Sequence, residues 1–336
     1  MTTGTPNFWE GRKVLVTGAG GFTGSNLCNR LAELNAEVTA FVRSNGAKRN
    51  LNPSVHVFSG DLTSVEDCNR AAEGVDTIFH VAAVFRNVNV TEEQLASVHV
   101  GSTEHLIRAA KAEDCRRFVH TSTIGVHGHV KNGPGDENTE FAPGDPYQST
   151  KADGEVRAFE LANELGVDLT VIRPCAIYGP GDTRFLKLVR PINKRRFVMI
   201  GDGEARYHFV HVDDLVSGYL LAGEVDAAVG EAFIIGGSES PTLNEVARDI
   251  AGILDVSAPK LRVPIGPVKA AAWLCEKVSA VLNVEPILHR RRLAFFTKNR
   301  QFSVAKAQRL LGYEPKVDLD TGLRALIEWY RAEGLI

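Results

Sequence analysis

The sequence is poor in cysteine, and its few cysteines follow no recognisable spacing. Five of them are scattered through 336 residues, and no two form a CxxC pair. Neither a disulfide framework nor a zinc site fits an odd number of isolated cysteines. We therefore expect small buried thiols in a protein of a reducing compartment. The cysteines are Cys28, Cys68, Cys115, Cys175 and Cys275.

The chain also lacks long apolar runs and any excess of positive charge. No segment approaches the roughly 20 apolar residues of a membrane-spanning helix, and the N-terminal MTTGTPNFWEGRK lacks the apolar stretch of a signal peptide. The formal net charge is −3, with both signs interspersed, which argues against a nucleic-acid surface. We expect a cytoplasmic protein with a small-molecule substrate, no nucleic-acid partner and no transmembrane segment; a homodimer is left open.

Apolar residues make up 44% of the chain and charged residues 24%, as in ordinary globular proteins. Six β-branched runs are expected strands: Val14–Thr17, Val38–Arg43, Val55–Gly60, Thr77–Ala82, Phe118–Ser122 and Leu169–Arg173. The expected helices between them are Gly24–Leu34, Ser64–Ala72, Gly101–Ala112 and Thr150–Leu165. Buried strands separated by helices predict a doubly wound parallel α/β sheet, whose ligand site lies at the carboxyl ends of the strands.

The pattern changes after Tyr178, where a turn leads into mixed helices and short strands. Residues 1–178 are expected to form a dinucleotide-binding Rossmann domain. Ala232–Gly236 reads as a strand, at about 231–236, that returns to the main sheet. Residues 179–230 and 237–336 are expected to form a smaller, mainly helical substrate-binding region.

A glycine-rich loop follows the first strand and opens a helix. Gly18 permits the tight turn off the strand, Gly21 lets the backbone approach a pyrophosphate, and Gly24 lets helix and strand pack closely. The diphosphate would then meet the unpaired N–H groups and positive end of the helix. In this strand–turn–helix context the pattern predicts dinucleotide binding rather than an ordinary turn.

The end of the second strand distinguishes NAD from NADP. NAD requires a carboxylate there for its ribose hydroxyls, but Phe41-Val-Arg43-Ser44-Asn45 contains no acid. A guanidinium at Arg43 suits the 2′-phosphate of NADP, so we favour NADP over NAD, with a solvated surface arginine as the alternative. Asp61, after the third strand, is expected to accept from the adenine amino group, to cap the next helix, or both.

Tyr147 and Lys151 are the candidate catalytic pair. They lie one helical turn apart where a predicted helix opens, so phenol and ammonium emerge on one face. A free tyrosine has a pKa of about 10, and a nearby ammonium favours the phenolate that can accept a proton. Lys151 can also bond the nicotinamide ribose. Thr121-Ser122-Thr123 ends the preceding strand, where a hydroxyl would hold the substrate oxygen against Tyr147.

Taken together, these motifs resemble the short-chain dehydrogenase/reductase family in its extended branch. That branch holds NAD(P)-dependent epimerases and dehydratases and 3β-hydroxysteroid dehydrogenases. The resemblance covers nearly the whole chain. It rests on TGAGGFTG (Thr17–Gly24), GDL (Gly60–Leu62), FHVAA (Phe79–Ala83), TST (Thr121–Thr123), YQSTK (Tyr147–Lys151), RPCAIYGPGD (Arg173–Asp182) and FVHVDDL (Phe209–Leu215).

The resemblance implies roles for individual residues. Tyr147 is the acid/base, Lys151 its partner and Thr123 the catalytic hydroxyl residue. Ala82 and Ala83 would line the dinucleotide, and Pro174 would begin a loop near the nicotinamide carboxamide. The residues inferred from the motifs and those implied by the resemblance together form the expected cofactor-binding set: Gly18, Gly21, Phe22, Thr23, Gly24, Arg43, Asp61, Leu62, Ala82, Ala83, Tyr147, Lys151 and Pro174.

Three positions depart from the family's pattern. His99 stands where the family often has asparagine. Ile124-Gly125 replaces the Asp-Glu pair with which the sugar-nucleotide dehydratases eliminate water, so we argue against dehydration. Tyr207, preceded by Arg206, stands where many sugar-nucleotide epimerases have an arginine, which puts diphosphate recognition in doubt.

The C-terminal third is expected to supply the substrate side. The basic clusters His289–Arg292 and Lys298–Arg300 fit either substrate phosphates or a solvated helix face. An amphipathic helix between Pro267 and Val284 fits core packing, a lid over an apolar substrate, or a membrane surface. The pair His127 and His129 lacks further ligands, so we expect no metal.

Three functions follow, in this order. The first is hydride transfer at a secondary alcohol or ketone of a nucleotide sugar, as an epimerase or keto-reductase. The second is the same chemistry on a 3β-hydroxysteroid or other apolar alcohol, favoured by the missing phosphate arginine. The third is a non-catalytic dinucleotide-binding sensor, ranked last because Tyr147 and Lys151 are both present.

Overall fold

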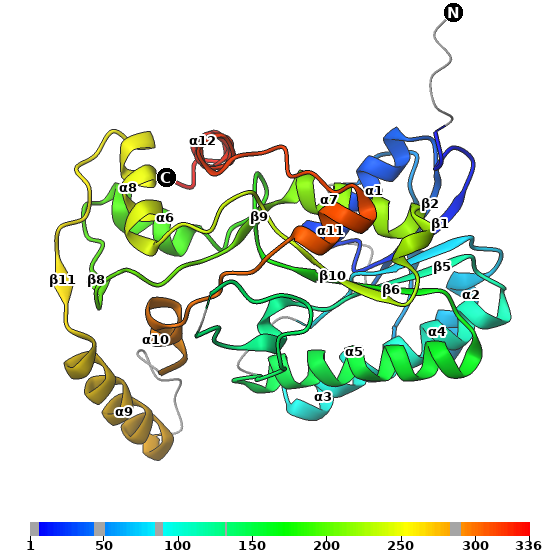
Figure 1. The fold of residues 1–336 in the computed structure, drawn as a ribbon, viewed down its shortest axis with the longest axis horizontal. Coiled ribbons are helices and arrows are strands. Elements are labelled where there is room, and N and C mark those ends of the chain that lie inside the picture. Colours follow the sequence, from blue (N-terminus) through cyan, green and yellow to red (C-terminus); the bar gives the residue numbers. More distant parts are fainter. Residues whose placement is uncertain (1–6, 44–50, 85–89, 132, 283–289) are drawn as a thin grey trace, which may run out of the picture.

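The computed structural model describes residues 7–43, 51–84, 90–131, 133–282 and 290–336. Its central layer is a seven-stranded parallel sheet in the order β10-β6-β5-β4-β1-β2-β3, which confirms the predicted doubly wound α/β fold (Figure 1). The strands are β1 (Lys13–Thr17), β2 (Glu37–Val42), β3 (His56–Ser59), β4 (Thr77–His80), β5 (Arg117–Thr121), β6 (Leu169–Pro174) and β10 (Glu231–Ile235).

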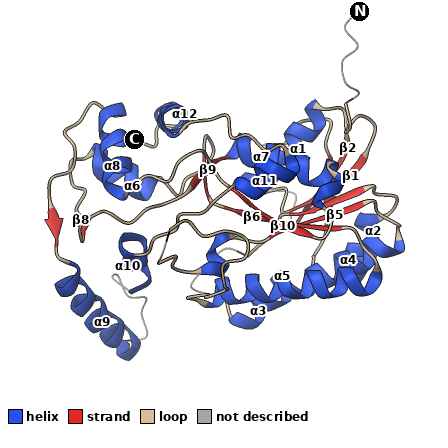
Figure 2. Ribbon diagram, viewed as in Figure 1, coloured by secondary structure: helices blue, strands red, loops and turns tan. Residues whose placement is uncertain are grey.

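Helices cover both faces of this sheet, as Figure 2 shows. On one face α4 (Ser102–Ala112) packs between α2 (Val65–Ala72) and α5 (Pro146–Leu165). On the other face α1 (Phe22–Glu33) packs against α7 (Val212–Glu224). Successive strand residues point to opposite faces, so each strand contributes to both apolar cores.

The strand order reverses between β1 and β4, which are neighbours in the sheet. From β1 the chain first adds β2 and β3 on one side, and then crosses to add β4, β5, β6 and β10 on the other. After β1 the chain continues into α1 on one face of the sheet, whereas after β4 it leads to α4 on the other face. In such sheets ligands bind in the crevice at this point.

Several helix ends and one helix cap differ from those expected; α1, for example, begins at Phe22 rather than Gly24. Alpha-helix α5 begins at Pro146 rather than Thr150, because proline suits the first helical position and the Asp145 carboxylate accepts from Gln148 N–H at 3.1 Å. Ser64, rather than Asp61, caps α2, with its hydroxyl accepting from Asp67 N–H at 3.2 Å. The capping role considered for Asp61 was wrong.

The C-terminal half builds a further apolar core beyond the sheet. Its helices α6 (Leu186–Asn193), α8 (Leu243–Ile253) and α12 (Leu319–Ala332) contribute buried leucines, isoleucines and valines. Strand β10 lies beside β6, where a returning strand was expected at Ala232–Gly236. The remaining elements are α3 (Glu92–Ala96), the π-helix Ser97–Gly101, the 3-10 helices Ile124–His127 and Asp226–Ala228, β7 (Ala176–Tyr178), β8 (Met199–Ile200), β9 (Phe209–His211), β11 (Arg262–Val263), α9 (Ile265–Leu282), α10 (Arg290–Thr297) and α11 (Ala305–Leu311).

Helix α9 covers the amphipathic stretch expected between Pro267 and Val284. Figure 1 shows it projecting from the C-terminal half, with α10 beside it. Ala272 is buried and Cys275 half-buried, whereas the indole of Trp273 is 52% exposed. The helix therefore presents apolar surface to solvent as well as to the protein.

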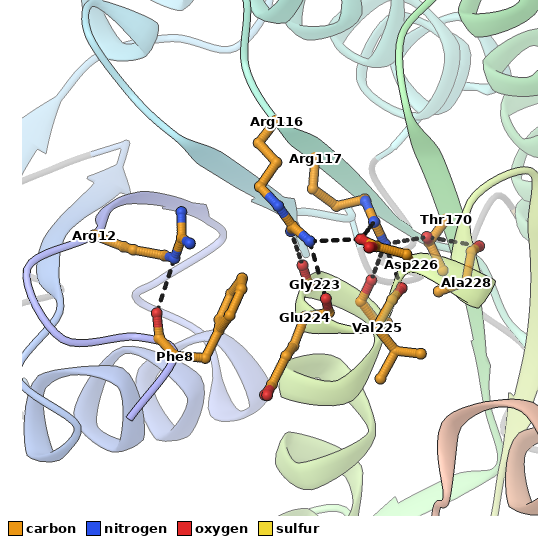
Figure 3. Close-up of polar contacts among 11 residues, drawn as sticks. Phe8, Arg12, Arg116, Arg117, Thr170, Gly223, Glu224, Val225, Asp226 and Ala228 are labelled. Atoms are coloured by element: carbon orange, nitrogen blue, oxygen red, sulfur yellow. Dashed lines mark hydrogen bonds and ion pairs between the residues drawn. The ribbon is translucent and has the colours of Figure 1, made fainter. Parts of the chain in front are cut away.

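Two adjacent arginines at the start of β5 hold the C-terminal end of α7 (Figure 3). Arg117 is 1% exposed, and its Nη1 donates to Ala222 O at 2.9 Å and Val225 O at 3.0 Å. Arg116 donates to Gly223 O and Glu224 O, at 2.7 and 3.0 Å. The last carbonyls of a helix have no partners within it, so these guanidinium groups supply donors to the last three carbonyls of α7 and to Val225 O, which follows the helix.

We predict that Arg117→Met destabilises the fold without touching the sheet edge where ligands bind. The substitution leaves Ala222 O without its donor and removes one of the two donors to Val225 O, which should lower the free energy of unfolding by about 2–4 kcal/mol. Urea unfolding measures the loss. Arg30→Met, which removes an exposed ion pair with Glu33, is the control and should cost no more than about 0.5 kcal/mol. Equal losses in both variants would contradict the role given to Arg117.

Candidate active site

The glycine loop after β1 leaves a cradle without side chains. Gly18 has φ +67°, and a Cβ there would lie 2.7 Å from Ala82 Cα in the loop after β4. A Cβ on Gly24 would overlap the carbonyl oxygen of Gly18. Gly21 is the N-cap of α1 and has no side chain to satisfy the first N–H groups. Bare backbone at a helix N-terminus fits a dinucleotide diphosphate, with Phe22 and Thr23 in the first turn.

Arg43 and Asp61 lie at the ends of β2 and β3, which are neighbours in the sheet. Arg43 is exposed directly after β2. Hydrogen bonds from Thr63 to the Asp61 carboxylate lower the pKa of Asp61, and the Arg43 charge lowers it further. The two side chains therefore lie within electrostatic reach of each other. Leu62 is half-buried beside them, and Ser44 and Asn45 lie outside the described residues.

The end of β4 is tied to the end of β1 by an imidazole. Thr17 Oγ1 accepts from Ala82 N–H at 3.2 Å and bonds His80 Nδ1 at 2.8 Å. His80 Nε2 bonds Ser102 on α4 at 3.3 Å. Ala82 is buried and Ala83 exposed, so the chain emerges from the sheet between them. His80 was not among the predicted site residues, although the FHVAA motif contains it.

Tyr147 and Lys151 occupy the first two turns of α5. The Lys151 ammonium donates to Thr121 O at the end of β5 and is only 2% exposed. Burial lowers the pKa of Lys151 to about 8, partly offset by the Glu155 carboxylate one turn further along α5. The Tyr147 ring is half-buried and meets the His99 ring edge to face, with centroids 5.3 Å apart.

The three hydroxyl residues at and just after the end of β5 have different surroundings. Thr121 Oγ1 bonds Tyr219 OH on α7 at 2.8 Å, and Ser122 is buried. Thr123 is half-buried, and its Oγ1 accepts from Gly125 N–H at 3.0 Å. Gly125 lies between Thr123 and the first turn of α5. A Cβ placed on Gly125 would be 3.2 Å from Thr123 Oγ1 and 3.3 Å from Gln148 Cγ, so the absence of a side chain there lets Thr123 lie close to this turn.

The predicted site residues thus lie along one edge of the sheet. The glycine loop, Arg43, Asp61, Ala82 and Thr123 follow the carboxyl ends of β1, β2, β3, β4 and β5, and Pro174 is the last residue of β6. Neighbouring parallel strands all end there. This edge is where a dinucleotide and a substrate can lie together.

The substrate side contains aromatic rings and two cationic groups. Tyr207 is 3% exposed, and its ring packs on Phe209 and Phe295 with centroids 5.9 and 4.9 Å away. The Arg300 guanidinium lies 5.7 Å from the Tyr207 ring centre. The Lys298 ammonium lies beside Gly144, in the loop just before α5: a Cβ placed on Gly144 would be 3.1 Å from Lys298 Nζ. The other basic cluster expected on the substrate side, His289–Arg292, has side chains that the structure does not describe.

The side chain of Arg206 points away from this site. Its Nη1 donates to Ser240 O at 2.9 Å, and it is exposed. Histidines considered for a metal serve the fold: His127 Nε2 bonds Arg173 at 3.2 Å, and His129 Nδ1 accepts from Asn299 N–H at 3.0 Å. Among the described residues, no cluster of three or more potential ligand side chains could hold a metal ion.

The NAD dependent epimerase/dehydratase family matches residues 14–236 of the chain. The chain belongs to this family. It is 33% identical over 340 residues to a 3 beta-hydroxysteroid dehydrogenase/Delta 5-->4-isomerase of Mycobacterium tuberculosis, covering 95% of this chain and 90% of that protein. It is 31% identical over 347 residues to short-chain dehydrogenase/reductase family 42E member 1 of Danio rerio, covering 95% and 88%.

Solved structures share the fold across nearly their full length. MoeE5 in complex with UDP-glucose and NAD matches with a TM-score of 0.75 and 26% identity, covering 96% of this chain and 99% of that one. The family and these relatives make the chain an NAD(P)-dependent oxidoreductase or epimerase acting on a small molecule. Within the described part of the chain, no helix combines the length and apolarity that crossing a bilayer requires.

We predict that Lys151→Met makes the protein more stable near neutral pH. The folded protein holds this ammonium at a cost, because its pKa falls from 10.5 to about 8. The cost is full below pH 8 and fades as the pH rises towards 10.5. Removing the charge should raise the free energy of unfolding by about 1–3 kcal/mol at pH 7, and by less above pH 10.

Denaturant unfolding at several pH values measures this gain. Lys187→Met, on the exposed face of α6, is the matched control and should show no such pH dependence. A Lys151→Met protein that is less stable at pH 7, or whose gain does not change with pH, would contradict the prediction.

Proposed function

We propose that the enzyme oxidises a secondary alcohol of an apolar, 3β-hydroxysteroid-like substrate, or reduces the matching ketone. The observation that carries this proposal is the aromatic packing at Tyr207. Many sugar-nucleotide epimerases place an arginine there for the diphosphate, whereas here a buried phenol packs on Phe209 and Phe295. The 3β-hydroxysteroid dehydrogenase relative, similar over nearly the whole chain, supports the same class of substrate.

In this proposal Tyr147 exchanges the proton with the substrate oxygen. During oxidation its phenolate accepts the hydroxyl proton, while the Thr123 hydroxyl donates a hydrogen bond to the substrate oxygen and holds it in place. Lys151 lies one helical turn from Tyr147 on α5, and its ammonium donates to Thr121 O. A positive charge at this spacing favours the phenolate. The bound nicotinamide would supply the hydride acceptor for the carbinol carbon, which then becomes the ketone carbon.

The cofactor is proposed to be NADP. The glycine loop would hold its diphosphate, and Arg43 would bind the 2′-phosphate. Arg43 follows β2 directly and is exposed, and no carboxylate stands between Phe41 and Asn45 to bind the ribose hydroxyls of NAD. Ala83 and Pro174, at the ends of β4 and β6, are proposed to line the nicotinamide half.

A nucleotide sugar is the second candidate substrate, for an epimerase or keto-reductase. The Arg300 side chain has no hydrogen-bond or ion-pair partner among the described residues. With Lys298 beside the loop that leads into α5, it would suit a phosphate. MoeE5, which binds UDP-glucose and NAD, is a structural relative.

A non-catalytic sensor is disfavoured by the Tyr147–Lys151 pair. A cytoplasmic location, a homodimer and the division of the chain into two regions near Tyr178 stay predictions from the sequence.

We predict that Tyr147→Phe abolishes turnover and leaves NADP binding nearly intact. The ring and its packing remain, and only the proton-exchanging oxygen is removed. A 3β-hydroxysteroid with NADP and a UDP-sugar with the same cofactor are assayed in parallel, and fluorescence titration measures NADP affinity. Unchanged turnover in the variant would overturn the mechanism. Turnover of the UDP-sugar alone, lost in Arg300→Met, would replace the first substrate class with the second.

Arg43→Asp is predicted to weaken NADP far more than NAD. The substitution removes the guanidinium from the 2′-phosphate and sets a carboxylate where the NAD ribose hydroxyls could bond it. Dissociation constants for both cofactors measure the effect. Arg30→Asp on the exposed side of α1 is the charge-matched control and should leave both affinities unchanged. Equal loss of NADP and NAD in Arg43→Asp would remove the 2′-phosphate role.

A further inference from the structure

His99 is a buried imidazole at the junction of three parts of the site. It lies in the π-helix Ser97–Gly101, which joins α3 to α4, and is 1% exposed. A π-helical turn inside an α-helix is rare and often occurs at functional sites. The proposed proton exchange between Tyr147 and the substrate assigns no role to this residue.

The π-helix lies against the catalytic face of α5. His99 meets the Tyr147 ring edge to face, and its Nδ1 bonds Thr150 Oγ1 at 2.8 Å. One turn further, a Cβ on Gly154 would overlap the carbonyl oxygen of His99. Residues 147, 150 and 154 share one face of a helix. One residue therefore contacts α5 over the two turns that carry Tyr147 and Lys151.

The other side of the imidazole reaches the loop after β4. Val84 N–H donates to His99 Nε2 at 3.2 Å. Because that backbone group is always a donor, Nε2 must accept, and the ring hydrogen must sit on Nδ1. Burial, together with the Lys151 charge, lowers the pKa of His99 to about 3, so the ring is neutral.

The remaining hydrogen bonds then run in one direction. His99 Nδ1–H donates to Thr150 Oγ1, and that hydroxyl donates to Pro146 O at 3.0 Å. Pro146 is the first residue of α5, directly before Tyr147. Val84 comes two residues after Ala82, whose N–H bonds Thr17 beside the glycine loop. A continuous chain of hydrogen bonds thus links the loop after β4 to the turn that carries Tyr147.

We propose that His99 is a positioning residue that sets the Tyr147 phenol relative to the dinucleotide held by the loops after β1 and β4. Its fixed Nδ1–H form bridges Val84 and Thr150, and its ring supports the tyrosine ring. This inference rests on the proposed role of Tyr147. It assigns no proton transfer to His99 and requires no contact between His99 and the substrate.

Three substitutions at this position separate the two hydrogen bonds. His99→Phe keeps an aromatic ring and loses both bonds. The amide of His99→Asn ends near the place of Nδ1, so it can still reach Thr150, whereas the longer His99→Gln can reach Val84. We expect His99→Phe to lower kcat on the order of 10- to 100-fold through misplacement of Tyr147. His99→Asn should recover most of kcat but bind NADP more weakly, and His99→Gln should do the reverse.

A double-mutant cycle with Thr150→Val tests the coupling. Thr150→Val should lower kcat in the native protein and have little further effect in His99→Phe, because the shared hydrogen bond is already lost. Thermal unfolding of every variant checks that the folded fraction is unchanged. His56→Gln, at the exposed amino end of β3, is the control and should leave kcat and NADP affinity unaltered.

The outcomes separate this inference from the proposed function. If Tyr147→Phe keeps full turnover, the proposed function fails. If Tyr147→Phe is inactive but His99→Phe keeps native kcat and KM, the positioning role fails alone. It also fails if the losses at His99 add to those at Thr150, or if kcat in all three variants falls only as the folded fraction falls. Should His99→Phe not fold, the opposite effects of His99→Asn and His99→Gln still decide the matter.

Discussion

The site depends on a backbone contact at the point where the strand order reverses. Gly18 and Ala82 leave neighbouring strands and approach so closely that even a methyl group on Gly18 would strike the next main chain. The Thr17 hydroxyl, at the end of β1, joins the same two loops by accepting a hydrogen bond from Ala82 N–H. Because this contact excludes side chains, the N-terminus of α1 stays open towards a phosphate, and the ends of the other strands are arranged on both sides of it.

Lys151 is a buried charge whose pKa is lowered by its surroundings. The ammonium bonds Thr121 O, and Glu155 lies one turn further along α5, itself paired with Arg173. Three imidazoles, of His80, His99 and His120, surround this charge and are kept neutral mainly by burial. Perturbed ionisable groups of this kind gather at functional sites. The arrangement fits a lysine that serves chemistry rather than folding.

The two halves of the molecule contribute differently to this chemistry. The sheet and its loops fix the groups proposed to bind the cofactor and to exchange the proton, and they do so through backbone contacts and hydrogen bonds. The C-terminal half brings Tyr207, Phe295 and Arg300 together on the side where the substrate is proposed to bind. None of these three side chains lies in a strand of the main sheet, and specificity is expected to vary at such positions while a fold is kept.

The sequence alone determined the doubly wound sheet, the glycine loop and the Tyr147–Lys151 pair. Strand and helix periods, a glycine at positive φ and a one-turn spacing are local properties that a short stretch of chain expresses by itself. Tertiary structure decided which of Ser64 and Asp61 caps α2, how Arg117 closes α7 from a distant strand, and where Tyr207 packs. It also brought His99 to Thr150 across 51 residues. Such contacts depend on which elements become neighbours, and side-chain hydrogen bonds between distant elements leave no periodic trace in a sequence.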